Sequence, residues 1–167
     1  MTSVYGYNTP GNSRVFFKET QKPYTVNKNS VLDFISNHPD TSLFAYIVEL
    51  AGLTELLDDP MFNSTVFIPR DSDLVQRYNE NMFKDMSPEL AFRIVKYSIL
   101  GNKIEYWTLR TLNYSALVPK DSYDRIEFAN SLGKLTLNEH INVLPMDTVC
   151  VNGVILFTDD LLVPYTA

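Results

Sequence analysis

A short run of β-branched and aromatic residues, Thr65–Ile68, stops at Pro69 and limits what this chain can fold into. Such residues favour a strand, and proline cannot donate a hydrogen bond to a neighbouring strand, so the strand is expected to end there. Asp71 and Ser72 follow at once and offer side-chain caps for a helix. The segment predicts a strand that passes directly into a helix.

A second apolar segment, residues 149–157, lies more than 80 positions further on and contains Asn152-Gly153 at its centre. Asparagine and glycine both tolerate the positive φ of a type I′ turn, and this dipeptide between apolar triplets is typical of a two-residue β-hairpin. We therefore expect two core strands here, joined by a tight turn.

Helical patterns come first along the chain and strand patterns second. Apolar residues at three- and four-residue spacing, bounded by capping residues and glycines, predict helices over residues 31–35, 43–51, 54–57 and 88–100, and one that begins at residue 71 or 72. Short strands are expected over residues 104–108, 113–118, 126–128, 135–137, 141–144, 148–151 and 154–158. Helices followed by strands, without alternation, indicate an α+β fold.

The composition is that of one globular domain. A chain of 167 residues, 45% hydrophobic and 20% charged, can build a full apolar core without metals or disulfides. Its net charge of −6 argues against nucleic acid as a partner, because binding to phosphates depends on Lys and Arg. The partners expected are other proteins.

Cys150 is the only cysteine, which excludes a disulfide within the chain. Its neighbours Val149 and Val151 suggest a buried strand position, where a thiol is an inert apolar group. The N-terminus lacks the basic start and apolar segment of a signal peptide, and no stretch is apolar for long enough to span a bilayer. If the sequence is the complete product, we expect a cytoplasmic or virion location; a trimmed chain would remove that inference.

Residues 1–29 differ from the rest and are expected to form an extended arm, with the folded domain over residues 30–167. Glycines and prolines interrupt any periodicity in the arm, yet aromatic side chains recur through it: Tyr5, Tyr7, Phe16, Phe17 and Tyr24. A segment that only stays solvated would be poor in aromatics, so these residues are candidate contacts. The arm either folds back on its own domain, with residues 14–18 as an edge strand, or docks on a neighbouring protein.

Taken in order, these segments resemble the fasciclin domain over roughly residues 30–165. The resemblance rests on a helix followed by Ala51-Gly52-Leu53, a first motif, a helix that leads to Tyr97, and a closing motif. The motif residues are Thr65, Val66, Phe67, Pro69 and Asp71 in the first, and Asn152, Gly153, Val154, Asp159, Leu162 and Pro164 in the second. The resemblance implies a wedge of two β-sheets flanked by several helices, an adhesion or interaction role, and no catalytic centre or cofactor.

Two positions depart from the family pattern. Ser98 and Leu156 stand where the family commonly has histidines. The resemblance marks the stretch around Tyr97 as a candidate interaction site, and the loss of both histidines argues against recognition of the integrin type there.

No arrangement of residues predicts an enzyme. His38 lies in a turn before Pro39 and His140 at the start of a strand, and neither stands in a nucleophile motif. The acid pairs 58–59, 71/73 and 159–160 lack the alternating oxygen ligands of a calcium loop. We expect no metal, with Asp71 as a cap and Asp159 as an acceptor at a strand end.

Three functions remain open at this point. The first is a structural assembly component, for which a minor capsid or virion-associated protein of a large DNA virus is the specific hypothesis, since such viruses encode fasciclin-like proteins. The second is a cell-surface or matrix adhesion domain, which glycans on Asn113 would favour; Asn63 also begins a glycosylation pattern, but it lies just before a core strand, where a glycan would be awkward. The third is an enzyme or ligand binder with a pocket between helices and sheet, because a fold alone does not exclude one.

Overall fold

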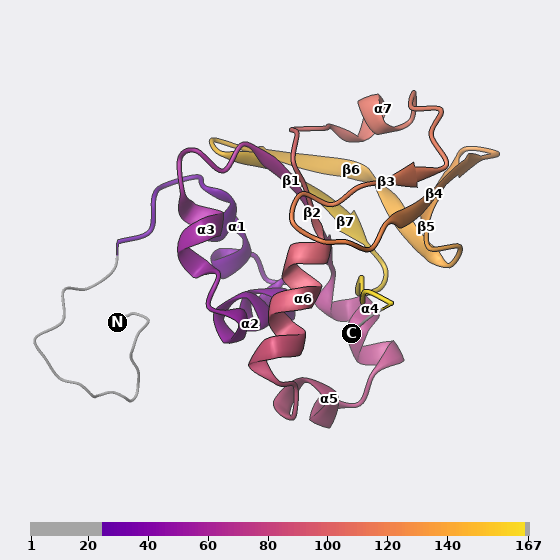
Figure 1. The fold of residues 1–167 in the computed structure, drawn as a ribbon. Helices are drawn as coiled ribbons and strands as arrows, with labels where there is room; N and C mark the ends of the chain where they lie inside the picture. Colours follow the sequence, from indigo (N-terminus) through magenta and orange to yellow (C-terminus); the bar gives the residue numbers. More distant parts are fainter. Residues whose placement is uncertain (1–24, 166–167) are drawn as a thin grey trace, which may run out of the picture.

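The computed structural model describes residues 25–165 of the chain, and its helices lie mostly in the first half of that part (Figure 1). The seven helices described are α1 (Val31–Asn37), α2 (Ser42–Ala51), α3 (Thr54–Asp58), α4 (Asp71–Arg77), α5 (Glu80–Lys84), α6 (Pro88–Tyr97) and α7 (Tyr106–Leu109). Gly52 ends α2 in the left-handed conformation, with φ of 73°. Ser87 caps α6, accepting a hydrogen bond from the Leu90 N–H, and Pro88 follows at the first position. These signals acted as predicted.

The strands form one mixed sheet in the order β2-β1-β7-β6-β5-β4-β3. They are β1 (Ser64–Pro69), β2 (Ile99–Leu100), β3 (Ala116–Leu117), β4 (Ile126–Ser131), β5 (Lys134–Leu137), β6 (Ile141–Cys150) and β7 (Gly153–Thr158). The two strands that carry the sequence motifs, β1 and β7, lie side by side and parallel, while every other described pair is antiparallel. All seven helices described precede the strands β3–β7, and the sheet is mixed with a single parallel pair among the described strands, which agrees with the α+β class.

The two sheets expected are two halves of this single sheet, which share the long strand β6. The first part of β6, Ile141–Val143, pairs with β5, and Val143 also pairs with Thr158 of β7; the last part, Asp147–Cys150, pairs with β7 alone. The register shifts between the two parts, so the strand bends there. A bridge between Leu100 and Pro119 links the two outer ends of the sheet, which is therefore nearly closed.

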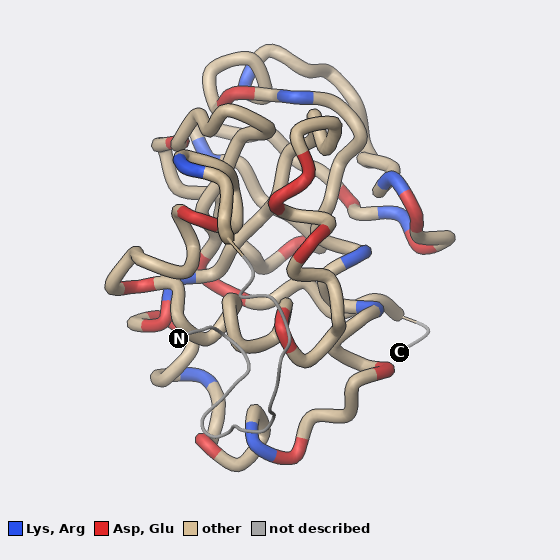
Figure 2. Tube along the Cα trace, turned by 90° about the vertical axis from the view of Figure 1, so that its left-hand side faces the viewer, with Lys and Arg blue, Asp and Glu red and all other residues tan. Residues whose placement is uncertain are grey.

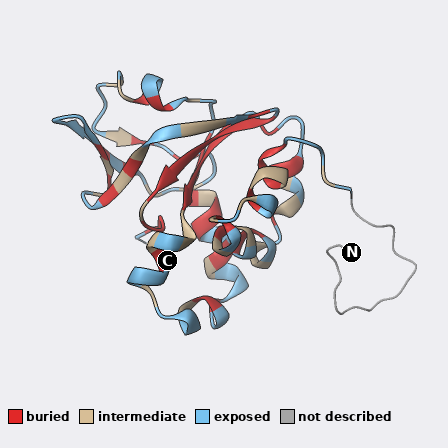
Figure 3. Ribbon diagram, turned by 180° about the vertical axis from the view of Figure 1, so that it is seen from behind, coloured by how far each residue is buried: buried red, intermediate tan, exposed pale blue. Residues whose placement is uncertain are grey.

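Alternate residues of the central strands face two separate cores. On one side, Val66, Ile68, Ile155 and Phe157 pack against the helices α1, α2 and α6. On the other side, Phe67, Val154 and Leu156 fill the interior of the curved sheet. Seen from behind, β1 and β7 are buried along their whole length (Figure 3). Strands buried on both faces read as continuous apolar runs, which is why these two segments dominate the sequence pattern.

Two expectations for the middle of the chain were wrong. Residues 99–100, expected to complete the helix that starts at residue 88, pair with β1 as β2, since Ser98 already ends α6. Residues 104–108, expected as a strand, lead into the short helix α7, whose Tyr106 and Leu109 are buried beneath it. The Tyr106 N–H donates to the Asp147 carboxylate at 2.7 Å, a tertiary contact that overrides the local strand propensity.

Candidate interaction surface

The residues of the first motif hold the fold together. The Thr65 hydroxyl donates to the Asn102 carbonyl at 2.5 Å and accepts from the Ile104 N–H at 2.7 Å, so it ties the loop after β2 to β1. Phe67 is buried inside the curved sheet. Pro69 is the last residue of β1, opposite Thr158 in the ladder with β7. These motif residues position strands and present no reactive group to solvent.

Asp71 is a cap, as expected, but for a different helix. Its carboxylate accepts from the backbone N–H groups of Ser42 and Leu43 at 3.0 and 2.9 Å, at the start of α2. In return, Asp40 accepts from the N–H and hydroxyl of Ser72 at the start of α4. Asp71, the first residue of α4, thus caps the start of α2, and Asp40, just before α2, caps the start of α4. This exchange fixes α2 against α4.

The expected type I′ turn at Asn152-Gly153 was wrong. Cys150 pairs with Gly153, so the loop residues are Val151 and Asn152, and neither Asn152 nor Gly153 has a positive φ. Gly153 is required by space: a Cβ there would lie 2.6 Å from the Ser64 carbonyl oxygen of the adjacent strand. The glycine permits β1 and β7 to approach at their start.

Asn152 is a buried polar link between three segments. Its side-chain oxygen accepts from the Val31 N–H at 2.8 Å, at the start of α1. Its amide nitrogen donates to the carbonyls of Leu57 and Asp59, at the end of α3. The three contacts satisfy backbone groups that the helix ends leave open, and only a side chain with both a donor and an acceptor can make them.

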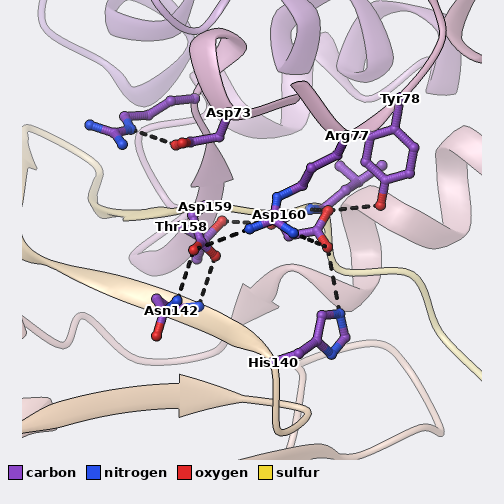
Figure 4. Close-up of polar contacts among 10 residues, drawn as sticks. Asp73, Arg77, Tyr78, His140, Asn142, Thr158, Asp159 and Asp160 are labelled. Atoms are coloured by element: carbon purple, nitrogen blue, oxygen red, sulfur yellow. Dashed lines mark hydrogen bonds and ion pairs between the residues drawn. The ribbon is translucent and has the colours of Figure 1, made fainter. Parts of the chain in front are cut away.

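A polar cluster lies where β7 ends (Figure 4). The Asp159 carboxylate accepts from the N–H and side-chain amide of Asn142, both at 2.8 Å, as expected of an acceptor at a strand end. The Asp160 carboxylate accepts from the Tyr78 hydroxyl and the Leu161 N–H, each at 2.7 Å. Arg77 of α4 approaches both acids, at 3.4 and 3.9 Å. The cluster clamps α4 onto the strand ends.

The contacts of this cluster hold elements of the fold together. Burial and the Asp160 hydrogen bond raise the pKa of Tyr78 to about 12, so the phenol stays protonated and serves as a donor. The His140 Nε2 lies 3.5 Å from the Asp160 carboxylate, which also accepts from Tyr78 and Leu161 (Figure 4). The carboxylates accept hydrogen bonds that hold elements in place, so the site stabilises the fold.

The other histidine is equally structural. The His38 ring stacks on Phe34 with centroids 4.9 Å apart, and its Nδ1 accepts from the Asp40 N–H at 3.0 Å. Within residues 25–165, no group of three or more His, Cys, Asp or Glu side chains is placed to hold a metal ion. None of the helices described there is long and apolar enough to cross a membrane.

Tyr97, a candidate interaction residue, is completely buried. Its hydroxyl donates to the Arg125 carbonyl at 2.7 Å and accepts from the Asn138 amide at 3.1 Å, and burial raises its pKa. The positions that depart from the family pattern lie in the interior: Leu156 packs in the same core, and the Ser98 hydroxyl donates to the Ile94 carbonyl. A partner could reach the ring only after a rearrangement, so a binding role for Tyr97 stays a prediction.

The five aromatic residues of the arm, Tyr5, Tyr7, Phe16, Phe17 and Tyr24, lie outside the described residues. The last part of the predicted arm, residues 25–29, already contacts the domain. Asn27 bonds Asp58 through its backbone N–H and its side-chain amide, and the Asn29 carbonyl accepts from the Val151 N–H at 2.9 Å. Residues 25–29 are therefore held against the domain.

An open groove of about 660 Å³ lies between α1 and the tip of the β6–β7 hairpin. It is lined by Asn29, Asp33, Phe34, Asn37, His38, Pro39 and residues 148–151. Val149 and Val151 are 61% and 65% exposed, although both belong to an apolar run. The sequence offered one signal for this surface: valines alternate with Cys150 at the hairpin tip, and only one face of that tip can be buried.

The pKa of Cys150, which lines this groove, is raised to about 11 by burial and by Asp33, in agreement with an inert thiol.

The domain carries more acidic than basic residues. Asp and Glu positions are spread over the chain with Lys and Arg scattered among them, as Figure 2 shows. Arg14, Lys18 and Lys22 against Glu19 give residues 1–24 a net charge of +2, which leaves −8 for residues 25–167 out of the total of −6.

Comparisons with known proteins agree with the geometry. The family model described as the fasciclin domain matches residues 39–164. A solved structure, a FAS1 domain pair from the insect cell adhesion molecule fasciclin I, is similar with a TM-score of 0.68 and 18% sequence identity. The match covers 83% of this chain and 52% of that one, so this chain spans about half of the pair. No curated protein sequence matches the chain.

Proposed function

The chain belongs to the fasciclin domain family, and on that premise we propose that it is a non-enzymatic protein-interaction module that serves as a structural assembly component. The proposal rests on the observation that the polar residues described above form hydrogen bonds and ion pairs within the domain itself. The acids, tyrosine and histidine of the cluster at the end of β7 bond one another or the backbone, as do the motif residues Thr65, Asp71 and Asn152. What remains for function is the surface and the arm.

The arm, residues 1–24, reaches onto a neighbouring subunit. Aromatic side chains of the kind that anchor interfaces recur along it, and its net charge of +2 opposes that of the domain. A minor capsid or virion-associated protein is the specific setting, because a capsid supplies closely spaced neighbours for such an arm. Nucleic acid does not fit as a partner, because the body carries a net charge of −8.

Deletion of residues 1–24 tests the proposal. The expected result is a domain with an unchanged far-UV circular dichroism spectrum that no longer enters the native assembly or retains its co-purifying proteins. Residues 25–29 stay in place because Asn27 and Asn29 contact the domain. Unchanged assembly and partner binding by a folded truncated protein would refute the role of the arm.

A second function, extracellular adhesion, is favoured by one observation. Asn63 and Asn113 begin glycosylation patterns, and both are exposed. The similar solved structure also comes from a cell adhesion molecule. Glycans on Asn113 of the native protein, detected by mass spectrometry after enzymatic release, would favour adhesion over assembly inside a cell or virion.

A further inference from the structure

The groove between α1 and the hairpin tip runs beside a strand edge that has no partner in residues 25–165. β5 covers only Ile141–Val143 of β6, and β7 occupies the opposite side of Asp147–Cys150. In an antiparallel ladder, alternate residues turn their N–H and C=O groups away from the paired strand. The Val151 N–H, in the hairpin loop, is taken by the Asn29 carbonyl, and Tyr106 at the start of α7 donates to Asp147. Between these two contacts, Thr148–Cys150 have no partner strand on this side among residues 25–165.

The walls of the groove suit an apolar, positively charged peptide. Val149 and Val151 are exposed on the hairpin, and Phe34 of α1, a partly buried ring stacked on His38, lines the same groove. Asp33 is the acidic residue among the lining side chains. An exposed strand edge with apolar flanks is a docking site for an extended peptide, which gains backbone hydrogen bonds and side-chain pockets together.

We propose that the groove receives residues 14–18 of the arm of a second copy of this chain, which adds to β6 as an extra edge strand. The segment reads Arg-Val-Phe-Phe-Lys, with β-branched and aromatic residues at its centre and a cation at each end. Val15 and Phe17 fall on one face of an extended strand, and Phe16 on the other. The proposal rests on the assembly function above and names the surface that the arm uses.

Charge favours this pairing between copies. The domain carries a net charge of −8, so two bodies repel, while an arm of net charge +2 is attracted to the net charge of the other body and to Asp33 in its groove. The arm is therefore the part of one copy that another copy attracts.

The course of residues 25–29 favours a neighbour over the chain's own groove. Asn29 contacts the hairpin loop at Val151, whereas two residues upstream Asn27 bonds Asp58 at the end of α3, so the chain leaves the hairpin in that direction. Phe16 lies nine residues before Thr25, a reach of about 30 Å when extended, and the whole arm can span about 80 Å. A domain of this size is roughly 35–40 Å across, so the arm can extend past its own body.

An arm that enters a groove elsewhere on the next copy makes a head-to-tail contact. Such contacts use two different surfaces, and they repeat into rings or filaments. This geometry suits a component of an assembly, since each copy both gives an arm and receives one.

Two full-length variants test the inference. The groove variant, Val151→Lys, places a cation at an exposed position of the hairpin loop that lines the groove, where it repels the cations at the two ends of the arm segment. The arm variant, Phe16→Ser/Phe17→Ser, removes the apolar centre of the segment. The matched control is Val118→Lys, because Val118 is also 65% exposed and lies outside the groove.

Sedimentation velocity should show concentration-dependent association of the natural protein and of Val118→Lys, but only monomers of the groove and arm variants. Mixed together, those two should form a 1:1 complex that grows no further, because one retains the arm and the other the groove. A labelled peptide of residues 10–24 should bind the arm variant, and adding Val151→Lys to that variant should weaken binding at least tenfold, against less than twofold for Val118→Lys.

Other outcomes would overturn the inference. A natural protein that stays monomeric and does not bind the peptide would place the arm in its own groove. Association that survives Val151→Lys would place the contact elsewhere. If the deletion of residues 1–24 abolishes assembly while Val151→Lys does not, the proposed function stands and only the groove is wrong; if neither change affects assembly, both fail.

Discussion

Replacing Gly153 by alanine separates two reasons for a glycine at this position. In a type I′ turn the glycine would supply positive φ, and alanine would cost about 1 kcal/mol in backbone strain. In this structure the φ of Gly153 is not positive, and the added Cβ meets the Ser64 carbonyl oxygen at 2.6 Å, Val31 at 3.1 Å and Phe62 at 3.3 Å. The Ser64 oxygen belongs to the β1 backbone and cannot move away as a flexible side chain would.

The expected cost follows from that contact. Separation to an ordinary distance requires β1 and β7 to move apart by several tenths of an ångström where their parallel ladder begins, so Gly153→Ala combines overpacking with weakened ladder hydrogen bonds. We expect a loss of about 2–4 kcal/mol in the free energy of unfolding. For a domain of this size, that lowers Tm by roughly 5–12 °C.

Three other glycines provide the controls. Gly101→Ala meets only the Lys120 side chain, at 3.7 Å or beyond, and should be neutral within about 0.5 kcal/mol. Gly52→Ala and Gly133→Ala meet nothing within 4 Å but have φ of 73° and 79°, so each should cost about 1 kcal/mol. Urea unfolding followed by far-UV circular dichroism gives all four values.

Asn152→Gly completes the test. A true type I′ turn would accept glycine at both central positions, whereas here the change removes three hydrogen bonds from buried backbone groups and should cost at least about 2 kcal/mol. The reasoning is refuted if Gly153→Ala is no worse than Gly52→Ala, or if Asn152→Gly is neutral.

Three further predictions concern the polar groups. Asp71→Ala should lower stability by about 1–2 kcal/mol in urea unfolding, because α2 loses its cap, and an unchanged midpoint would contradict the exchange of caps. The pKa of Tyr78 is raised to about 12 in the folded protein, so this tyrosine ionises at lower pH in the unfolded chain. The stability that the tyrosine contributes is therefore retained below pH 10 and lost as the pH rises toward 12. The advantage of the natural protein over Tyr78→Phe should therefore shrink between pH 8 and 11, by no more than about 1 kcal/mol for a half-buried ring, and a constant difference would contradict it. Cys150, with its pKa raised to about 11, should react with a thiol reagent at pH 8 many times more slowly in the native protein than in urea; equal rates would show an accessible thiol.

The sequence predicted those parts of the fold that depend on local signals. Ser87-Pro88 at the start of α6, Gly52 at the end of α2 and Pro69 at the end of β1 each act through their own backbone or the next turn. The same local logic misread Asn152-Gly153, because its two roles, a link to α1 and α3 and a close approach of β1, depend on segments more than 80 residues away. Long-range contacts of this kind produce no periodic pattern in the sequence from which they could be predicted.

The candidate surface was predictable only in part. The aromatic arm is visible in the sequence because its composition differs from the rest. The groove is formed by α1 and β6, whose lining residues Phe34 and Val149 lie 115 positions apart, so only the folded chain brings them together. The burial of Tyr97 could not be foreseen either, because it depends on the curvature of the whole sheet.

Chemical cross-linking of the native protein in its natural assembly tests the central claim most directly. Lys18 and Lys22 are the only lysines of the arm, and a lysine-reactive reagent followed by mass spectrometry identifies what lies beside them. The account predicts links from these two lysines to a neighbouring protein subunit, together with loss of the subunit from the assembly when residues 1–24 are deleted. Links confined to the same chain, with assembly intact after the deletion, would contradict it.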